Sequence, residues 1–274
     1  MKFIRLVWFD LKNGYFKNFF LLFAPIVITL FGCMEVKRLG TVWEEQVGAM
    51  DCWVYLYGGM KEYIPMAGNG FEFPAIWMLV FLMSAFCTLN YPMRDLHKMG
   101  RNVLVSGKSR KLWWFSKCSW NFLATVGYHG AILLIIFIIC KVLRMPLARK
   151  MNAAFIVNFF GMGTTEFVGD EKMSFAVMGS VLLFSIAINM LQMVLTLYMK
   201  PIFSFLIVCI ILLSSSYFML PIMIGNYGMV MRYQGIIENG VSQKVGVMIS
   251  LGILLGSILV GNRRFRKYDI LNQE

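Results

Sequence analysis

Residues 175–199 read FAVMGSVLLFSIAINMLQMVLTLYM and contain no Asp, Glu, Lys, Arg or His. After Lys200 and Pro201, residues 202–224 continue with IFSFLIVCIILLSSSYFMLPIMI, again without a charge. A helix needs about 20 apolar residues to cross the hydrocarbon core of a bilayer, and each run provides them. The two runs and the Lys-Pro turn between them predict a pair of adjacent membrane-spanning helices.

The composition of the whole chain agrees with this prediction. Of its 274 residues, 59% are hydrophobic and 15% are charged, and the mean hydropathy is +0.68. An average soluble domain has roughly 45–50% apolar and 25% charged residues. The composition excludes a disordered or collagen-like chain, and no polar stretch is long enough for a fused enzyme domain. We therefore expect an all-α integral membrane protein with a single transmembrane domain over residues 1–274.

Six apolar runs are long enough to be spans, while a seventh is too short. The short run, Met151–Met162, has only 12 residues. We interpret it as an interfacial or re-entrant helix. The six predicted spans are residues 19–36, 73–91, 122–142, 175–199, 202–224 and 245–261.

The distribution of positive residues predicts the orientation. With six spans, the side that carries both termini holds 16 Lys and Arg, and the opposite side holds 10. The side with more Lys and Arg near its spans is normally cytoplasmic. Acidic residues are distributed in the opposite way, with 4 on the side of the termini and 10 on the other. We therefore expect both termini, and the whole net charge of +12, on the cytoplasmic face.

The first 18 residues predict a helix that lies in the membrane interface. They mix apolar and charged residues and lack the small-residue cleavage site of a signal peptide. Their cations can meet lipid phosphates while Trp8 and the phenylalanines enter the acyl boundary. The alternative is a cytoplasmic extension of the first span.

The connection between the second and third predicted spans, residues 92–119, is strongly basic. It carries seven Lys and Arg against the single acid Asp95. Nucleic acid is an improbable partner, because the basic residues are confined to one short loop at the membrane surface. Anchoring to anionic lipid is one interpretation. The apolar residues mixed into the loop favour the docking of another protein, since a purely electrostatic tether would not need them.

Within the spans the polar residues are almost all uncharged. Asn189 and Gln192 are three residues apart and so share one helix face, and Ser214, Ser215 and Ser216 lie in the next span. Two interpretations stay open: hydrogen bonds between helices, or the lining of a substrate path. His129, the one ionisable residue in mid-span, is more typical of a hydrogen-bonded histidine than of a proton relay.

The cysteines and histidines give no sign of a metal site or a catalytic site. Five of the six cysteines lie inside or at the ends of apolar runs, where a thiol behaves as a small hydrophobe, and there are only two histidines. No Ser/His or paired-Asp constellation stands out at matching depths, so an intramembrane hydrolase is not expected.

An amphipathic N-terminus, six spans, a basic loop after the second span and a short basic tail together resemble an ABC-2 type transporter permease. The best local likeness is Gly100–Lys117, which looks like that family's entry to its third helix. The tail Arg263–Leu271 is similar to the family's endings. One departure is Gly225–Lys244, about twenty residues long, where the family often has short re-entrant helices between its last two spans.

This resemblance implies the transmembrane permease subunit of an ATP-driven ABC exporter in the bacterial plasma membrane. Its substrate would be amphiphilic, and an antimicrobial or toxic peptide is one candidate. In that family the loop after the second span docks on a cytoplasmic ABC ATPase, which binds ATP and Mg, and two permease chains, identical or paralogous, form the pathway. This chain would then bind no cofactor and would not itself be an enzyme. The residues implied in coupling are Arg94, Asp95, Lys98, Arg101, Leu104, Lys108 and Arg110.

Two other classes of membrane protein are alternatives to an exporter subunit. A secondary transporter is expected to show internal repeats or broken helices that bear charge, and neither is clear in this sequence. A non-transporting membrane scaffold or lipid-binding membrane protein is the remaining alternative. Co-purification with an ATP-binding protein would separate it from the exporter subunit.

Overall fold

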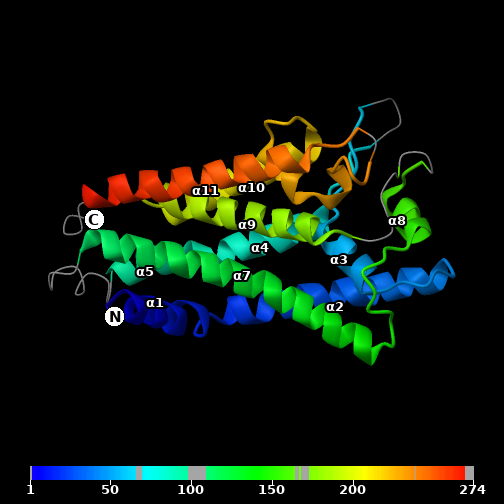
Figure 1. Cartoon of the computed structure of the whole chain (residues 1–274), viewed down its shortest axis with the longest axis horizontal. Helices are drawn as coiled ribbons and strands as arrows, with labels where there is room; N and C mark the ends of the chain where they lie inside the picture. Colours follow the sequence, from blue (N-terminus) through cyan, green and yellow to red (C-terminus); the bar gives the residue numbers. More distant parts are fainter. Residues whose placement is uncertain are drawn as a thin grey trace.

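The computed structural model describes residues 2–65, 70–97, 109–163, 167, 173–237 and 239–268. Helices dominate this part of the chain, and the two isolated β-bridges found in it form no sheet, so the all-α prediction is confirmed. Figure 1 shows an elongated bundle with both termini at one end, here named the terminal end; the opposite end is the distal end.

Five helices are long and apolar enough to cross a membrane, which makes the chain a multi-pass membrane protein by length and hydropathy. A sixth apolar helix, α10 (Pro201–Tyr217), has 17 residues and is shorter than the predicted span 202–224. Five of the six predicted spans are thus confirmed as helices long enough to cross a membrane, and the sixth, 202–224, corresponds to a shorter helix. The long helices are α2 (Phe19–Val42), α4 (Ala75–Leu89) with its continuation α5 (Tyr91–Asp95), α7 (Arg110–Val142), α9 (Phe175–Leu195) and α11 (Gln243–Arg266).

Helix α10 ends early because the chain after it folds back into the bundle. Two 3₁₀ turns, η3 (Ile224–Gly228) and η4 (Val230–Arg232), are buried there. The Asn226 amide donates hydrogen bonds to the carbonyls of Phe218 (3.1 Å) and Leu220 (2.8 Å), which would be helical hydrogen-bond acceptors in a longer α10. The segment Gly225–Lys244 between α10 and α11, which departs from the family in the sequence, thus contains short buried turns.

Helix α7 begins at Arg110, well before the predicted start at residue 122. The predicted loop 92–119 is therefore too long, since it includes most of α5 and the first turns of α7. The reason is that Ser116, Lys117 and Asn121 are buried in α7 and have polar partners inside the chain. A hydropathy window treats such polar residues as solvent-exposed, so it places the start of the span too late in the sequence.

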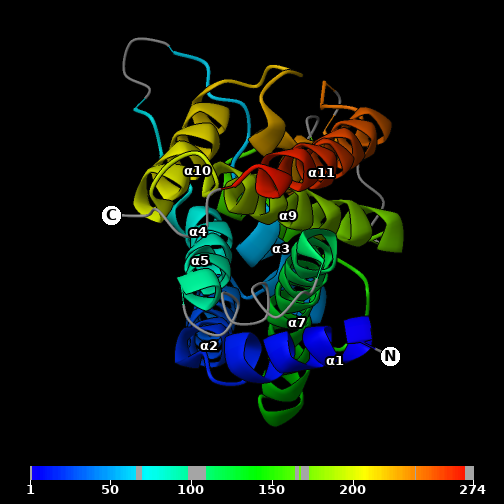
Figure 2. The same cartoon turned by 90° about the vertical axis from the view of Figure 1, so that its left-hand side faces the viewer.

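Three short helices lie at the ends of the bundle. Helix α1 (Lys2–Asp10) lies across the terminal end, and it is separate from α2, as the predicted interfacial helix requires (Figure 2). Helix α8 (Ala153–Phe160) has eight residues, too few for a span, in agreement with the interpretation of Met151–Met162. Helix α3 (Ala49–Tyr57) comes from the loop after α2 but is almost entirely buried against α2, α4 and α7.

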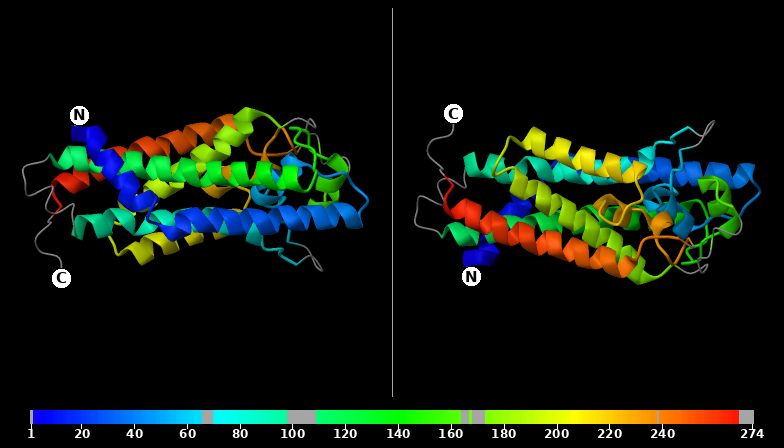
Figure 3. Two further views of the ribbon diagram at one scale, coloured as in Figure 1. Left: turned by 90° about the horizontal axis from the view of Figure 1, so that it is seen from below. Right: turned by 90° about the horizontal axis from the view of Figure 1, so that it is seen from above.

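The long helices pack in pairs. Helix α11 runs along α9 and α2 runs along α7, as the two views of Figure 3 show. A small apolar cluster at the terminal end joins α7, α9 and α11, and in it Trp113 stacks on Phe265 with 4.4 Å between ring centroids. This stacking holds the end of α11 close to the start of α7.

Helix α11 approaches α7 closely at Gly261, and this gives a test of the packing. A Cβ at Gly261 would overlap the ring of Trp114, which is 1% exposed, whereas a Cβ at Gly252 would meet nothing within 4 Å. We expect Gly261→Ala to destabilise the protein by about 1–3 kcal/mol, because overpacking displaces a fixed ring. Thermal unfolding in detergent measures this. The matched variant Gly252→Ala should unfold at or above the wild-type temperature, and an equal loss in both variants would contradict the packing.

Candidate functional site

A buried ionic cluster lies where the terminal end meets the basic loop. The ammonium of Lys117 in α7 contacts the carboxylates of Asp10, at the end of α1, and Asp95, at the end of α5; the Nζ–Oδ2 distance to Asp95 is 2.7 Å. Lys117 and Asp10 are fully buried and Asp95 is 9% exposed. Burial of charges on this scale requires pairing and hydrogen bonds, because the penalty for removing an ion from water is several kcal/mol.

The remaining polar groups of this ionic cluster are satisfied by neighbouring side chains. Asp10 accepts hydrogen bonds from the hydroxyls of Tyr91 (2.9 Å) and Ser116, and Asp95 accepts one from the indole N–H of Trp113 (3.2 Å). The ammonium also lies 5.0 Å from the centroids of the Tyr91 and Trp113 rings, at cation–π distance. Two carboxylates facing one ammonium leave a formal charge of −1.

This arrangement joins three segments that are far apart in sequence: α1, α5 and α7. Because α5 leads directly into the basic loop, a displacement of the loop would act on Asp95 and through Lys117 on a long helix. Of the predicted coupling residues, Asp95 is in the cluster and Arg94 is exposed beside it. Arg110 donates to the carbonyls of Arg266 (2.6 Å) and Tyr268 (3.0 Å), which ties α7 to the tail. The other four, Lys98, Arg101, Leu104 and Lys108, lie outside the described residues.

The predicted path residues Asn189 and Gln192 lie inside the bundle, where both are 1% exposed. The Asn189 amide donates to the hydroxyls of Ser84 and Thr125, each at 2.9 Å. The Gln192 amide donates to the carbonyl of Ala85 (3.1 Å). Both residues therefore connect α9 to α4, and Asn189 also connects it to α7. This is the geometry expected of hydrogen bonds between helices; a role in a substrate path stays a prediction.

The serines of α10 belong to a second buried charged group, centred on Arg232. The guanidinium is fully buried and donates to five acceptors, so each of its five N–H groups has a partner. Burial lowers the pKa of Arg232 to about 10, which still leaves the side chain charged near neutral pH. The acceptors are the carbonyls of Met60, Lys61, Ser215 and Ser216 and the side-chain oxygen of Asn226.

The hydroxyls of Ser214 and Ser215 both donate to the backbone carbonyl of Ile211 in the same helix, and the Ser216 hydroxyl donates to the carbonyl of Leu213. The Ser215 hydroxyl also accepts a hydrogen bond from the backbone N–H of Gly225 (3.0 Å). Ser215 and Ser216 are fully buried and Ser214 is half-buried. The three serines thus mark the place where the returning turns close on α10.

The structure brings together a Ser/His pair that the sequence did not reveal. The ring nitrogens of His129 lie 2.7 Å from the hydroxyl of Ser185 and 2.7 Å from that of Tyr57. All three residues are at most 5% exposed. A hydrolase needs room for a substrate and for water beside its nucleophile. The burial of this group instead fits a hydrogen-bonded link between α3, α7 and α9.

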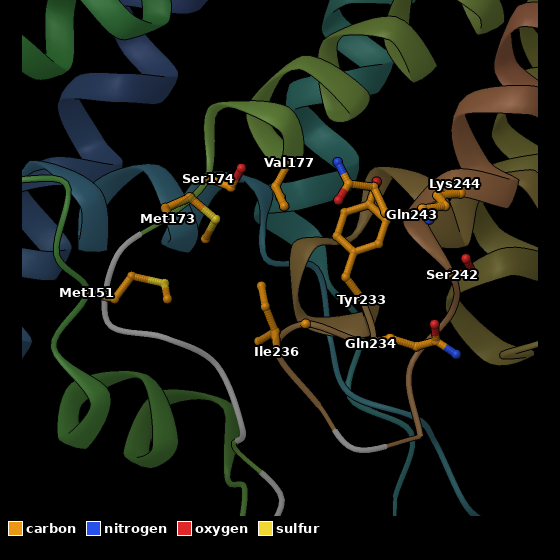
Figure 4. A pocket seen from close by; sticks show the side chains of 11 residues that line it. Met151, Met173, Ser174, Val177, Tyr233, Gln234, Ile236, Ser242, Gln243 and Lys244 are labelled. Atoms are coloured by element: carbon orange, nitrogen blue, oxygen red, sulfur yellow. The ribbon is translucent and has the colours of Figure 1, made fainter.

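A cavity of about 480 Å³ opens at the distal end between the start of α9 and the chain after Arg232. Figure 4 shows Tyr233 and Ile236 facing Met151 and Met173 across it. Among the described residues that line it, Lys244 alone is charged. The rest of this described lining is neutral and suits an apolar or weakly polar group.

No metal site or disulfide is present in the described part of the chain, which includes all six cysteines. Comparison with family models, curated proteins and solved structures finds no match to this chain. The functional assignment therefore rests on the residues and their geometry.

The ionic cluster makes a direct prediction about stability. Lys117→Met removes the cation that pairs with two buried carboxylates, and we expect it to destabilise the protein by about 3–5 kcal/mol. The triple variant Asp10→Asn, Asp95→Asn, Lys117→Met removes all three charges and should recover most of this loss. Thermal or denaturant unfolding in detergent measures both. The matched control is Lys111→Met, at an exposed position nearer the start of the same helix. An equally large loss of stability there would contradict the burial of the ionic cluster.

Proposed function

We propose that this chain is the transmembrane subunit of an ATP-driven ABC exporter of the ABC-2 type, with both termini in the cytoplasm. The observation that supports this most directly is the ionic cluster of Asp10, Lys117 and Asp95. It connects the helix that lies across the terminal end, the start of the basic loop and a long helix. A membrane protein driven by a separate ATPase needs such a connection, because the force arises outside the bilayer.

In this proposal the loop between α5 and α7 docks on the ATPase, which holds ATP and Mg. Movement of the loop displaces Asp95, and Lys117 passes the displacement to α7, against which α1 and α2 pack. Rigid coupling is favoured because a separated Lys117 would be an unpaired buried charge. A second permease chain, identical or paralogous, completes the pathway for an amphiphilic substrate such as an antimicrobial or toxic peptide.

Docking by the loop can be tested with Leu104→Glu. A buried apolar contact that becomes an unpaired charge costs several kcal/mol, so the variant should lose association with the ATPase and transport. The measurement is affinity purification of the full-length chain from its own membranes, followed by an assay of ATP hydrolysis in the eluate. Leu271→Glu in the tail is the control and should retain the activity.

A different result would support the alternative of a membrane scaffold or lipid tether. If no ATP-hydrolysing protein accompanies the wild-type chain, and Leu104→Glu changes only binding to anionic vesicles, the loop holds lipid and the exporter proposal fails.

The path prediction is tested with the double variant Asn189→Leu, Gln192→Leu. If these amides contact the substrate during transport, the variant should alter transport or substrate-stimulated ATP hydrolysis and leave assembly nearly intact. Because the amides connect α9 to α4 and α7, loss of thermal stability is measured in parallel. Loss of folding without a selective change in transport would identify them as packing residues and remove them from the path.

A further inference from the structure

A cavity of about 910 Å³ lies at the terminal end, between α5, the turn from α9 to α10 and the end of α11. We propose that it binds the phosphate headgroup of an anionic phospholipid. The inference does not depend on the proposed export function. Its lining residues include Arg94, His97, Lys200, Arg264 and Tyr198.

The charge of the lining points to an anion. It holds three permanent cations and a histidine, from three separate parts of the chain, and the described lining contains no Asp or Glu. Arg264 is held in place because its guanidinium lies over the Tyr198 ring, 5.0 Å from the centroid, and its Nε is 3.5 Å from the Leu197 carbonyl. Arg94 and Lys200 are exposed and make no ion pair with any described residue. Arg and Lys together are the usual ligands of a phosphate.

The start of α10 adds to this preference. Lys200 is its N-cap residue and Pro201 its first residue, so the cavity also faces the positive end of a 17-residue helix. This contribution is smaller than that of the side chains, and it acts in the same direction.

The surface next to the cavity distinguishes a lipid from a free phosphate. Ile202, Phe203 and Leu206 on the first turns of α10 are 61%, 54% and 53% exposed. They form an apolar surface that continues from the basic lining along the helix. A molecule with an anionic head and long acyl chains satisfies both surfaces at once, and basic pockets between membrane helices bind lipid headgroups in this way. A free phosphate would use only the first.

Native mass spectrometry of the purified full-length chain tests the proposal with two probes, dioleoyl phosphatidylglycerol and dioleoyl phosphatidylcholine. We expect the anionic lipid to bind about tenfold more tightly, since each nearby cation contributes a several-fold preference. The double variant Arg94→Gln, Lys200→Gln should reduce the ratio several-fold, to what Arg264 alone supports. Arg94→Lys, Lys200→Arg keeps both charges and should keep the preference.

The matched control is Lys111→Gln, Arg263→Gln, which removes the same charge from exposed positions at the same end, outside the cavity. It should retain most of the preference. An equal loss in this control would show general attraction to a basic surface and overturn the proposed site, as would equal binding of the two lipids to the wild type. Competition by millimolar glycerol phosphate would identify a free phosphate compound as the ligand and overturn the lipid assignment.

Discussion

A charged side chain is stable inside an apolar helical bundle only when other groups of the protein replace its water. Lys117 and Arg232 are both fully buried, and they meet this constraint in different ways. Lys117 faces two carboxylates, which themselves accept hydrogen bonds from Tyr91, Ser116 and Trp113. The hydrogen-bond acceptors of Arg232 in the described part of the chain are all neutral oxygens. Each charge therefore fixes the positions of several segments at once, Lys117 at the terminal end and Arg232 at the distal end.

The two groups also differ in what they can do. In the cluster of Lys117 the partners are ionised side chains on separate helices, so relative movement of those helices changes the electrostatic energy directly. Around Arg232 most acceptors are backbone carbonyls, including two in the last turn of α10. These carbonyls lack helical partners, and a cation at a helix C-terminus is favourable. The group around Arg232 therefore holds its segments in fixed positions, while the ionic cluster around Lys117 responds to relative movement of its helices.

The sequence was sufficient for the elements that depend on hydropathy and length, and insufficient where buried polar residues decide. The long helices, the separate α1 and the shortness of α8 follow from apolar runs and their interruptions. The early start of α7 depends on the pairing of Lys117 with Asp10, residues 107 positions apart. A lone lysine in the apolar context WWFSKCSW was a signal, but nothing local identifies its partner. Likewise, nothing in the sequence around Arg232 indicates that its guanidinium binds the last carbonyls of α10.

The shortness of α10 has a consequence for the surrounding lipid. With a rise of about 1.5 Å per residue, its 17 residues cover about 25 Å, less than the roughly 30 Å hydrocarbon thickness of a typical bilayer. Its outer face is lined by exposed apolar residues such as Leu206, Ile210 and Leu213 and so faces acyl chains. The exposed apolar side chains of Phe218, Leu220 and Ile222 continue this face beyond the end of the helix, so acyl chains there lie against non-helical backbone. Lipid offers no hydrogen bonds to backbone groups, so the carbonyls beyond Tyr217 need partners inside the protein, and the Asn226 amide supplies them at Phe218 and Leu220.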